Sequence, residues 1–457
     1  MYDTIIIGAG MSGLAAGVRL AHFGRKVCIL ERHGTIGGLN SFYRQRGRTY
    51  DVGLHAVTNY AAKGARTGPM ARLLRQLRLA WDEWALAPQL GSVIMFPAAG
   101  LRFSNDFSLL ESEVRCRFPR QTDNFRRLVA SLHDYDQLGQ SGADRSARQV
   151  VSEIIDDPLL VEMIFCPVLF YGGSREHDIG FDQFSILFRS IFLEGLARPL
   201  AGIQRILTIL ARRFKEQGGE LRLKAGAARI VVEQDAVKKI VLEDGSELEA
   251  RNVLSSAGWT ETMRLCDDGH VEEATASNRI SVVESISILD SQPRALGHEQ
   301  TIIFYNDSDK FHYEKPDDLV DLRSGTICSP NNFAYPEPLD EGILRITALA
   351  NYERWAALDS EAYRRAKQEW VEKLMESAAR FVPDFRGSVI GGDMFTPLTI
   401  HRFTGHTGGA VYGAADKRRD GTSHLKNLYI CGNDQGLVGI VGAIISGISI
   451  ANRYLLK

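Results

Sequence analysis

The sequence lacks an excess of charge of either sign. Its 54 lysines and arginines and 56 aspartates and glutamates give a formal net charge of −2. No lysine- or arginine-rich tract marks a surface that would follow a nucleic-acid backbone, so we expect no nucleic-acid partner. Its 457 residues allow two or three domains at roughly 100–200 residues each.

Cysteines are also few. The six cysteines are scattered along the chain, and no two have the C-x-x-C spacing that is typical of metal and redox sites. We therefore expect free thiols, buried or half-buried, in a reducing compartment, rather than disulfides or a metal centre.

Long apolar runs are scarce as well. No charged stretch, apolar stretch and cleavage site precede the first predicted strand, so the sequence predicts a cytoplasmic protein. The apolar, glycine-rich segment 436–451 is shorter than the about 20 residues that a membrane-spanning helix needs, which favours a buried helix.

A glycine-rich turn follows a short strand at the start of the chain. Residues 4–7 form a short, continuously apolar run, as a central parallel strand requires. Gly8, Gly10 and Gly13 follow at G-x-G-x-x-G spacing. The first glycine permits the tight turn, the second lets the backbone approach a pyrophosphate, and the third lets the helix pack closely on the strand.

The residues after this turn complete a dinucleotide-binding β-α-β unit. A helix is predicted to begin near Met11 and Ser12 and to end at Gly24, and a second strand leads to Glu31, 18 residues after Gly13. A carboxylate at that place accepts hydrogen bonds from a ribose, and the positive end of the helix suits a pyrophosphate. This unit alone leaves FAD and NAD open, as well as a glycine-rich turn with no ligand.

Two motifs follow the unit. Glu31 and Arg32 begin an E-R-x4-G-G pattern, and an aromatic-D-x-G pattern ends at Gly53. This order resembles the flavoprotein superfamily of amine oxidases, protoporphyrinogen oxidases and carotene desaturases. The resemblance implies FAD as the cofactor, with the double-glycine turn beside the pyrophosphate and ribityl chain and the D-x-G turn near the isoalloxazine. The residues that it assigns to FAD in these two turns are Gly38, Leu39, Asn40, Gly53, Leu54 and His55.

Two later segments resemble further FAD-binding parts of the same superfamily. Segment 202–258 resembles the part that places one backbone amide and carbonyl against the adenine. Segment 427–455 resembles the final FAD segment, in which the N-terminus of a small-residue helix faces the pyrimidine edge of the flavin, where negative charge gathers on reduction. The ribityl contact is left open between Asn433 and Asp434. The residues assigned to FAD in both segments are Ala227, Ala257, Gly258, Gly432, Asn433, Asp434, Gly439, Ile440 and Val441.

The resemblance implies an α/β fold with two domains. We expect a discontinuous Rossmann-like FAD-binding domain of the glutathione-reductase and amine-oxidase type, formed by residues 1–85, 196–265 and 386–457. An α+β substrate domain, formed by residues 86–195 and 266–385, is expected to be inserted in two pieces. A second G-x-G-x-x-G motif for NAD(P)H is absent, so the electron donor or acceptor stays open.

Three details favour one branch of the superfamily. Leu39 stands where amine oxidases and many desaturases carry arginine, and segments 51–55 and 395–413 resemble those of phytoene desaturase, carotenoid isomerase and retinol saturase-like proteins. The resemblance implies an FAD-dependent oxidoreductase that desaturates, saturates or isomerises an apolar isoprenoid or polyene by hydride exchange at flavin N5. One alternative is an amine oxidase or a protoporphyrinogen oxidase-like enzyme. Another is a non-catalytic prenyl-binding protein like the GDP-dissociation inhibitors, although these tend to lose the glycine pattern.

Two residues are candidates for a catalytic role. His55 would exchange a proton with a substrate above the flavin; alternatively, it is bonded to backbone and only shapes the cavity, because hydride transfer to a hydrocarbon needs no acid or base. Tyr412 would line the same cavity, or would simply pack with its hydroxyl satisfied. Arg402 would bind a phosphate or a carboxylate, with a structural ion pair as the alternative.

The inserted segments are rich in aromatic residues. Phe181, Phe184, Phe188 and Phe192 recur at helical spacing, which predicts one helix face. Core packing is the simplest interpretation. The alternatives are an apolar substrate tunnel and a rim that rests on a bilayer, with a basic edge from Arg189 and Arg198 as a peripheral membrane contact. Strands are expected at 326–330 and 344–350, and a charged amphipathic surface helix at 359–381.

Overall fold

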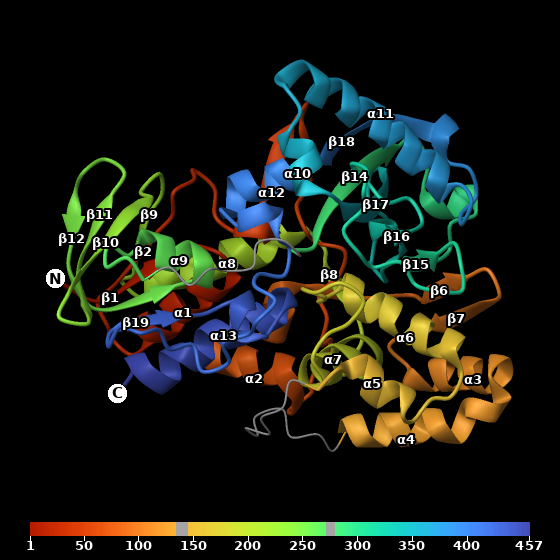
Figure 1. The fold of residues 1–457 in the computed structure, drawn as a ribbon, viewed down its shortest axis with the longest axis horizontal. Helices are drawn as coiled ribbons and strands as arrows, with labels where there is room; N and C mark the ends of the chain where they lie inside the picture. Colours follow the sequence, from red (N-terminus) through yellow and green to blue (C-terminus); the bar gives the residue numbers. More distant parts are fainter. Residues whose placement is uncertain (134–144, 271–278) are drawn as a thin grey trace.

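The computed structural model describes residues 1–133, 145–270 and 279–457. Two large sheets form the centres of two halves of the molecule, and a group of helices completes the second half (Figure 1).

The first sheet is parallel and has five strands in the order β19-β13-β1-β2-β9. Its central strand is buried on both faces, as the apolar sequence of residues 4–7 predicts. The predicted β-α-β unit is confirmed, and segments 202–258 and 427–455 return to this sheet as expected. The strands are β1 (Tyr2–Ile7), β2 (Val27–Leu30), β9 (Glu220–Arg222), β13 (Ala250–Ser255) and β19 (Leu428–Ile430).

Helices cover one face of this sheet, and a small antiparallel sheet with one helix covers the other. On the first face, α1 packs between α8 and α13, and α2 packs against α13. The four helices are α1 (Met11–His22), α2 (Gly68–Leu77), α8 (Ile203–Glu216) and α13 (Gly439–Ile450). The other face is covered by β10 (Ala227–Glu233), β11 (Ala236–Leu242), β12 (Glu247–Leu248) and α9 (Trp259–Leu265).

The second sheet has seven strands in the order β18-β14-β17-β16-β15-β6-β7. One of its faces packs on α11 (Ser360–Ala378), through buried residues such as Trp370 and Leu374. The predicted strands at 326–330 and 344–350 and the amphipathic helix at 359–381 are confirmed within three residues at each end. The strands are β6 (Ser92–Phe96), β7 (Ala99–Phe103), β14 (Ser281–Leu289), β15 (Ile302–Asn306), β16 (Ser324–Cys328), β17 (Gly342–Ala350) and β18 (Val389–Phe395).

Two short strand pairs and two short helices connect these sheets. The first pair is β3 (Phe42–Gln45) with β4 (Arg48–Asp51), and the second is β5 (Leu86–Pro88) with β8 (Ala197–Pro199). The helices are α10 (Tyr352–Ala356) and α12 (Pro397–Thr404). All five strands of the parallel sheet come from the three segments predicted to form the FAD domain, while β18, from the last segment, lies at an edge of the seven-stranded sheet.

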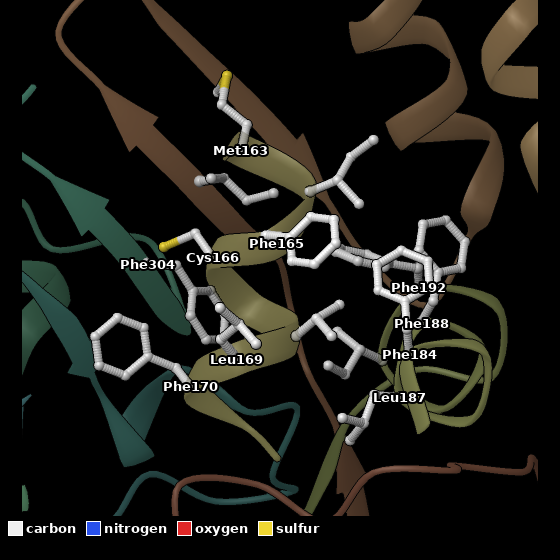
Figure 2. Close-up of a cluster of buried hydrophobic side chains, with 14 of the residues drawn as sticks. Met163, Phe165, Cys166, Leu169, Phe170, Phe184, Leu187, Phe188, Phe192 and Phe304 are labelled. Carbon is white, nitrogen blue, oxygen red and sulfur yellow. The ribbon is translucent and has the colours of Figure 1, made fainter. Parts of the chain in front are cut away.

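A helical group packs beneath β6 and β15. Figure 2 shows side chains from α6 and α7 meeting Phe304 of β15 in one cluster. Phe184, Phe188 and Phe192 are at most 2 % exposed, which confirms core packing and is incompatible with a bilayer-facing rim made of these rings. The helices are α3 (Phe107–Arg117), α4 (Thr122–His133), α5 (Ala147–Ser152), α6 (Pro158–Phe170) and α7 (Phe181–Phe188), followed by a π-helical turn, η4 (Arg189–Leu193).

The helix predicted at 436–451 is α13, and it is buried against α1. In the described parts of the chain, no helix combines the length and the apolar character that crossing a membrane requires.

Candidate functional site

The glycine loop leaves open space beside one of its residues. A Cβ atom built on Gly10 meets nothing within 4 Å, and one built on Gly38 meets only the Gly10 Cα at 4.0 Å. In contrast, a Cβ on Gly13 would collide with the Gly8 carbonyl oxygen, because α1 packs closely on β1. Gly13 therefore serves packing, whereas Gly10 and Gly38 border a space that a ligand can fill.

The helix that starts at this loop has uncapped backbone donors. Neither Gly10 at the start of α1 nor Val438 at the start of α13 provides a side-chain cap. The first N–H groups of an α-helix have no partner within the helix and carry a partial positive charge. The two helix N-termini, which include Met11 and Ser12 in α1 and Gly439 to Val441 in α13, thus supply donors for an anionic or electron-rich ligand.

Glu31 closes the loop from the end of β2. Its Oε2 accepts a hydrogen bond of 3.0 Å from the Ala9 N–H, and its Oε1 accepts one of 2.9 Å from the His33 N–H. The carboxylate is only 7 % exposed and lies at the end of the strand, where the sequence predicts a ribose contact. The guanidinium of the next residue, Arg32, donates a hydrogen bond to the Arg402 carbonyl at 3.0 Å.

The double-glycine turn and the D-x-G turn are bonded to each other and to the loop. The Gly37 N–H donates to the Ala9 carbonyl at 2.9 Å, and the Asn40 amide donates to the Gly53 carbonyl at 3.2 Å. Gly53 has a φ of +65°, and a Cβ there would lie 2.7 Å from the Leu39 carbonyl oxygen. The predicted FAD turns, 37–40 and 51–55, therefore form one continuous wall.

The C-terminal loop meets the same region. Gly432 has a φ of +102°, and its N–H donates to Ser446 Oγ at 2.7 Å. Both oxygens of Asp434 accept backbone N–H groups, from Ala414 at 2.7 Å and from Trp259 at 2.6 Å. Asp434 thereby fixes the loop and joins it to the end of β13, where Ala257 and Gly258 lie. Asn433 is half-buried and donates to the Val411 carbonyl at 3.3 Å.

Ala227 is the first residue of β10 and is paired with Leu242, next to an irregularity in the register. The turn before it is attached to the dinucleotide unit, because the Ala225 N–H donates to the Glu31 carbonyl at 2.8 Å. The structure thus brings the segment assigned to the adenine beside Glu31, the carboxylate assigned to the ribose.

His55 sits at the centre of a buried ionic cluster that joins the two halves of the molecule. Its Nε2 lies 2.9 Å from Thr347 Oγ1 and 3.4 Å from Glu284 Oε2. Glu284 forms an ion pair with Arg345. Burial alone would raise the pKa of Glu284, but Arg345 and His55 hold it below its ordinary value.

Arg198 holds the backbone of the turn that carries His55. Its guanidinium donates to the carbonyl oxygens of Leu54 at 2.6 Å and His55 at 2.9 Å, and to Asp51 Oδ2 at 2.6 Å. The predicted basic surface edge is wrong for this residue, because Arg198 is 5 % exposed and its charge is matched by Asp51.

Asp51 is occupied by structural contacts. Its Oδ1 accepts the Ile203 N–H at 3.1 Å, which caps α8, and its carbonyl accepts from Arg345 at 3.0 Å. The sequence marked the D-x-G turn but did not indicate that Arg198, Glu284 and Arg345 would lie around it, since these residues lie far away along the chain.

The flavin containing amine oxidoreductase family matches residues 11–455. The chain belongs to this family. It is a flavin oxidoreductase, and its cofactor is FAD, which the glycine cradle, the two uncapped helix ends and Glu31 fit.

Several named relatives align with nearly the whole flavin oxidoreductase chain. A prolycopene isomerase of Daucus carota is 21% identical, and the alignment covers 99% of this chain and 80% of that protein. An all-trans-retinol 13,14-reductase of Danio rerio is 23% identical over 99% and 86%. A lycopene-forming phytoene desaturase of Pseudescherichia vulneris is 24% identical over 100% and 99%. Among solved structures, an oxidoreductase from Methanosarcina mazei superposes with a TM-score of 0.67 at 17% identity, covering 98% of this chain and all of that one. This likeness shows that the fold is shared.

Other predicted polar residues of the flavin oxidoreductase have structural partners. The Tyr412 hydroxyl donates to the Phe170 carbonyl oxygen, which is the packing alternative with its hydroxyl satisfied. The Arg402 guanidinium lies 5.6 Å from the Phe403 ring centroid.

Lys417 is a half-buried lysine that no sequence motif indicated. Its Nζ donates to the Tyr412 carbonyl at 2.6 Å, and burial lowers the pKa of Lys417 to about 8. No motif surrounds this lysine, so only the fold reveals its position next to the C-terminal FAD loop.

Proposed function

We propose that this flavin oxidoreductase acts on an apolar isoprenoid or polyene, which it desaturates, saturates or isomerises. Bound FAD accepts or supplies a hydride at N5. The chain's own residues orient the substrate, exclude water and position His55.

The observation that carries the proposal is the group of aromatic side chains next to His55. Ring contacts run without a break from His55 to Tyr171, with centroids 6.2 Å apart, and on to Phe304 at 5.1 Å. Phe304 contacts Phe103, which contacts Phe192. These rings pack as core, so the part of the molecule behind His55 is apolar. An apolar environment favours a hydrocarbon over a hydrated, charged group.

The charges in the cluster support the same class of substrate. Asp51 and Glu284 are already paired with Arg198 and Arg345, so these carboxylates are satisfied without an ammonium group. A cationic amine would gain little from them while losing its own hydration. The relatives named for prolycopene, retinol and phytoene support an isoprenoid substrate.

Anaerobic mixing of the purified holoenzyme with a substrate panel tests this proposal. The panel contains acyclic carotenoids and retinoids in more and less saturated forms, with putrescine and protoporphyrinogen as controls. We expect a polyene or isoprenoid to change the flavin absorbance at about 450 nm, or to appear as a new double-bond isomer. Flavin reduction by an amine or by protoporphyrinogen alone would overturn the proposed substrate class.

A further inference from the structure

A row of polar side chains crosses the face of the seven-stranded sheet that lies opposite α11. Strand register places Phe304, Thr326, Thr347, Glu284 and Phe395 beside one another on β15, β16, β17, β14 and β18. The next row on this face is Ile302, Cys328, Arg345 and Ile286. Thr347, Glu284 and Arg345 thus form a compact polar group inside a largely apolar surface, directly below His55.

His55 is anchored to this group through one ring nitrogen. A carboxylate accepts hydrogen bonds and cannot donate them when ionised. The approach of Nε2 to Glu284 Oε2 favours the proton on Nε2, and in that tautomer the hydroxyl of Thr347, 2.9 Å from Nε2, is a second acceptor. In neutral imidazole the other nitrogen, Nδ1, then carries the lone pair.

Nδ1 of His55 has no protein partner among the described residues, and the His55 side chain is 12% exposed while that of Glu284 is 3% exposed. The turn that carries His55 is fixed by Arg198 and by the Cys328 thiol, whose Sγ lies 3.8 Å from the His55 carbonyl oxygen. Nδ1 is therefore the free, oriented nitrogen of a rigidly held ring.

Charged and titratable groups surround His55, and they decide how the net charge of the cluster changes when His55 gains a proton. The groups that face it are Asp51 on β4, Tyr171 after α6, Arg198 on β8, Glu284 on β14, Cys328 on β16 and Arg345 on β17. Burial raises the pKa of Cys328 to about 11 and that of Tyr171 well above its ordinary value, so both are neutral. The two carboxylates and the two arginines cancel, and a proton on Nδ1 therefore makes His55 the one group of this set that adds net charge.

We propose that Glu284 and Thr347 position His55 so that Nδ1 exchanges a proton with the substrate carbon next to the one that exchanges the hydride. In a saturation, the double bond gains a hydride on one carbon and the Nδ1 proton on the other, and His55 recovers its proton from solvent. In a desaturation, Nδ1 takes a proton from the C–H bond as the neighbouring carbon loses its hydride. This inference rests on the proposed function and assigns saturation or desaturation over isomerisation, because the exchange of a hydride and a proton on neighbouring carbons removes or creates a double bond.

Nitrogen-15 NMR of histidine-labelled protein tests the His55–Glu284 contact and needs no substrate. The His55 signals are assigned by comparison with His55→Gln. We expect neutral His55 to carry its proton on Nε2, and the share of the Nε2–H tautomer to fall in Glu284→Gln, because the carboxylate acceptor is lost. Thr347→Val keeps all four charges of the cluster and is also expected to increase the Nδ1–H tautomer. This second variant keeps the test decisive if the Glu284 variant does not fold.

Glu194→Gln is the matched control. Glu194 is a half-buried carboxylate, whose pKa is raised by its partial burial, and it accepts from Asn59 at 2.5 Å. Its substitution is expected to leave the His55 signals unchanged. A neutral His55 that carries its proton on Nδ1, or a tautomer ratio that is the same in Glu284→Gln as in the wild-type protein, would overturn the inference.

Kinetics with a panel substrate provide the second readout. His55→Gln is expected to lower kcat by about 10²–10⁴-fold with KM and FAD content little changed. It is also expected to remove the high-pH limb of the pH profile of saturation, because saturation uses the proton on Nδ1. Full activity of His55→Gln would contradict the inference while leaving the proposed function intact. Conversely, a panel without any substrate would contradict the proposed function and leave the NMR result on the His55–Glu284 contact standing.

Discussion

At the scale of single residues, the Arg198–Asp51 pair fixes the D-x-G turn. The pair is buried on both sides, with side-chain exposures of 6% and 11%. Removing one partner of such a pair costs about 3–5 kcal/mol, because the other charge is left uncompensated. The pair therefore holds the Leu54 and His55 backbone in place before any ligand binds.

The six free cysteines give a prediction at the same scale. Cys116 is exposed, and the other five are buried. Burial raises the pKa of Cys28 and Cys328 to about 11 and that of Cys266 and Cys431 to about 12, and it raises the pKa of Cys166 well above its ordinary value. A thiol reacts as its thiolate, so a disulfide reagent at mildly alkaline pH is expected to label one thiol of the native protein, Cys116.

The control for this labelling is the unfolded chain. In denaturant all six thiols are expected to react, and Cys116→Ser is expected to abolish labelling of the native protein. Rapid native labelling of Cys328 would contradict its buried position below His55.

At the scale of elements, local patterns account for what the sequence predicted. The β1-α1-β2 unit, the double-glycine turn and α13 each follow from spacing within about 30 residues, which sequence patterns report well. The polar group of Thr347, Glu284 and Arg345 depends on the register of β14 against β17. That register is set by long-range packing. The sequence around a single charged residue in an apolar strand does not indicate which residue will be its partner. The glycine turns assigned to FAD were thus predictable from the sequence, whereas His55 was the only member of the Thr347–Glu284–Arg345 group's surroundings that the sequence marked as a candidate.

The glycine loop carries a prediction about cofactor binding. Gly10 has a φ of −74° and open space beside it, so Gly10→Ala is expected to fold normally. Its methyl group would enter the space where a pyrophosphate approaches the backbone. We expect FAD affinity to fall by about tenfold or more, that is by at least about 1.4 kcal/mol, with the melting temperature of the apoprotein unchanged, as measured by fluorescence titration and thermal unfolding.

Gly387→Ala is the matched control for Gly10→Ala. A Cβ on Gly387 also meets nothing within 4 Å, but this residue lies in the short turn before β18, outside the predicted cradle. Its FAD affinity is expected to equal that of the wild-type protein. If both alanine variants bound FAD equally well, the open space beside Gly10 would not be the pyrophosphate site.

At the scale of the whole molecule, FAD links segments that the chain keeps far apart. The start of α1, the turn 37–40 and the loop 432–441 come from the first and last tenths of the sequence, and the adenine segment lies near its middle. The ionic cluster around His55 then connects these segments to the seven-stranded sheet through Glu284 and Arg345. Cofactor binding is therefore expected to stabilise both halves, because a ligand that binds only the native state raises the free energy of unfolding of everything that its site requires.

Hydrogen exchange of the apoprotein and the FAD-bound protein tests this linkage. On addition of FAD, we expect amide exchange to slow by about tenfold or more at the N-termini of α1 and α13, in the turns 37–40 and 51–55, and in β14 and β17 around Glu284 and Thr347. Exchange in α4, which lies in the helical group, is expected to change little and serves as the internal reference. Protection confined to residues 1–55 would show that the C-terminal segment does not contribute to the site. Protection of both FAD segments with none in β14 and β17 would instead show that the His55 cluster does not couple the cofactor to the sheet on which we place the substrate.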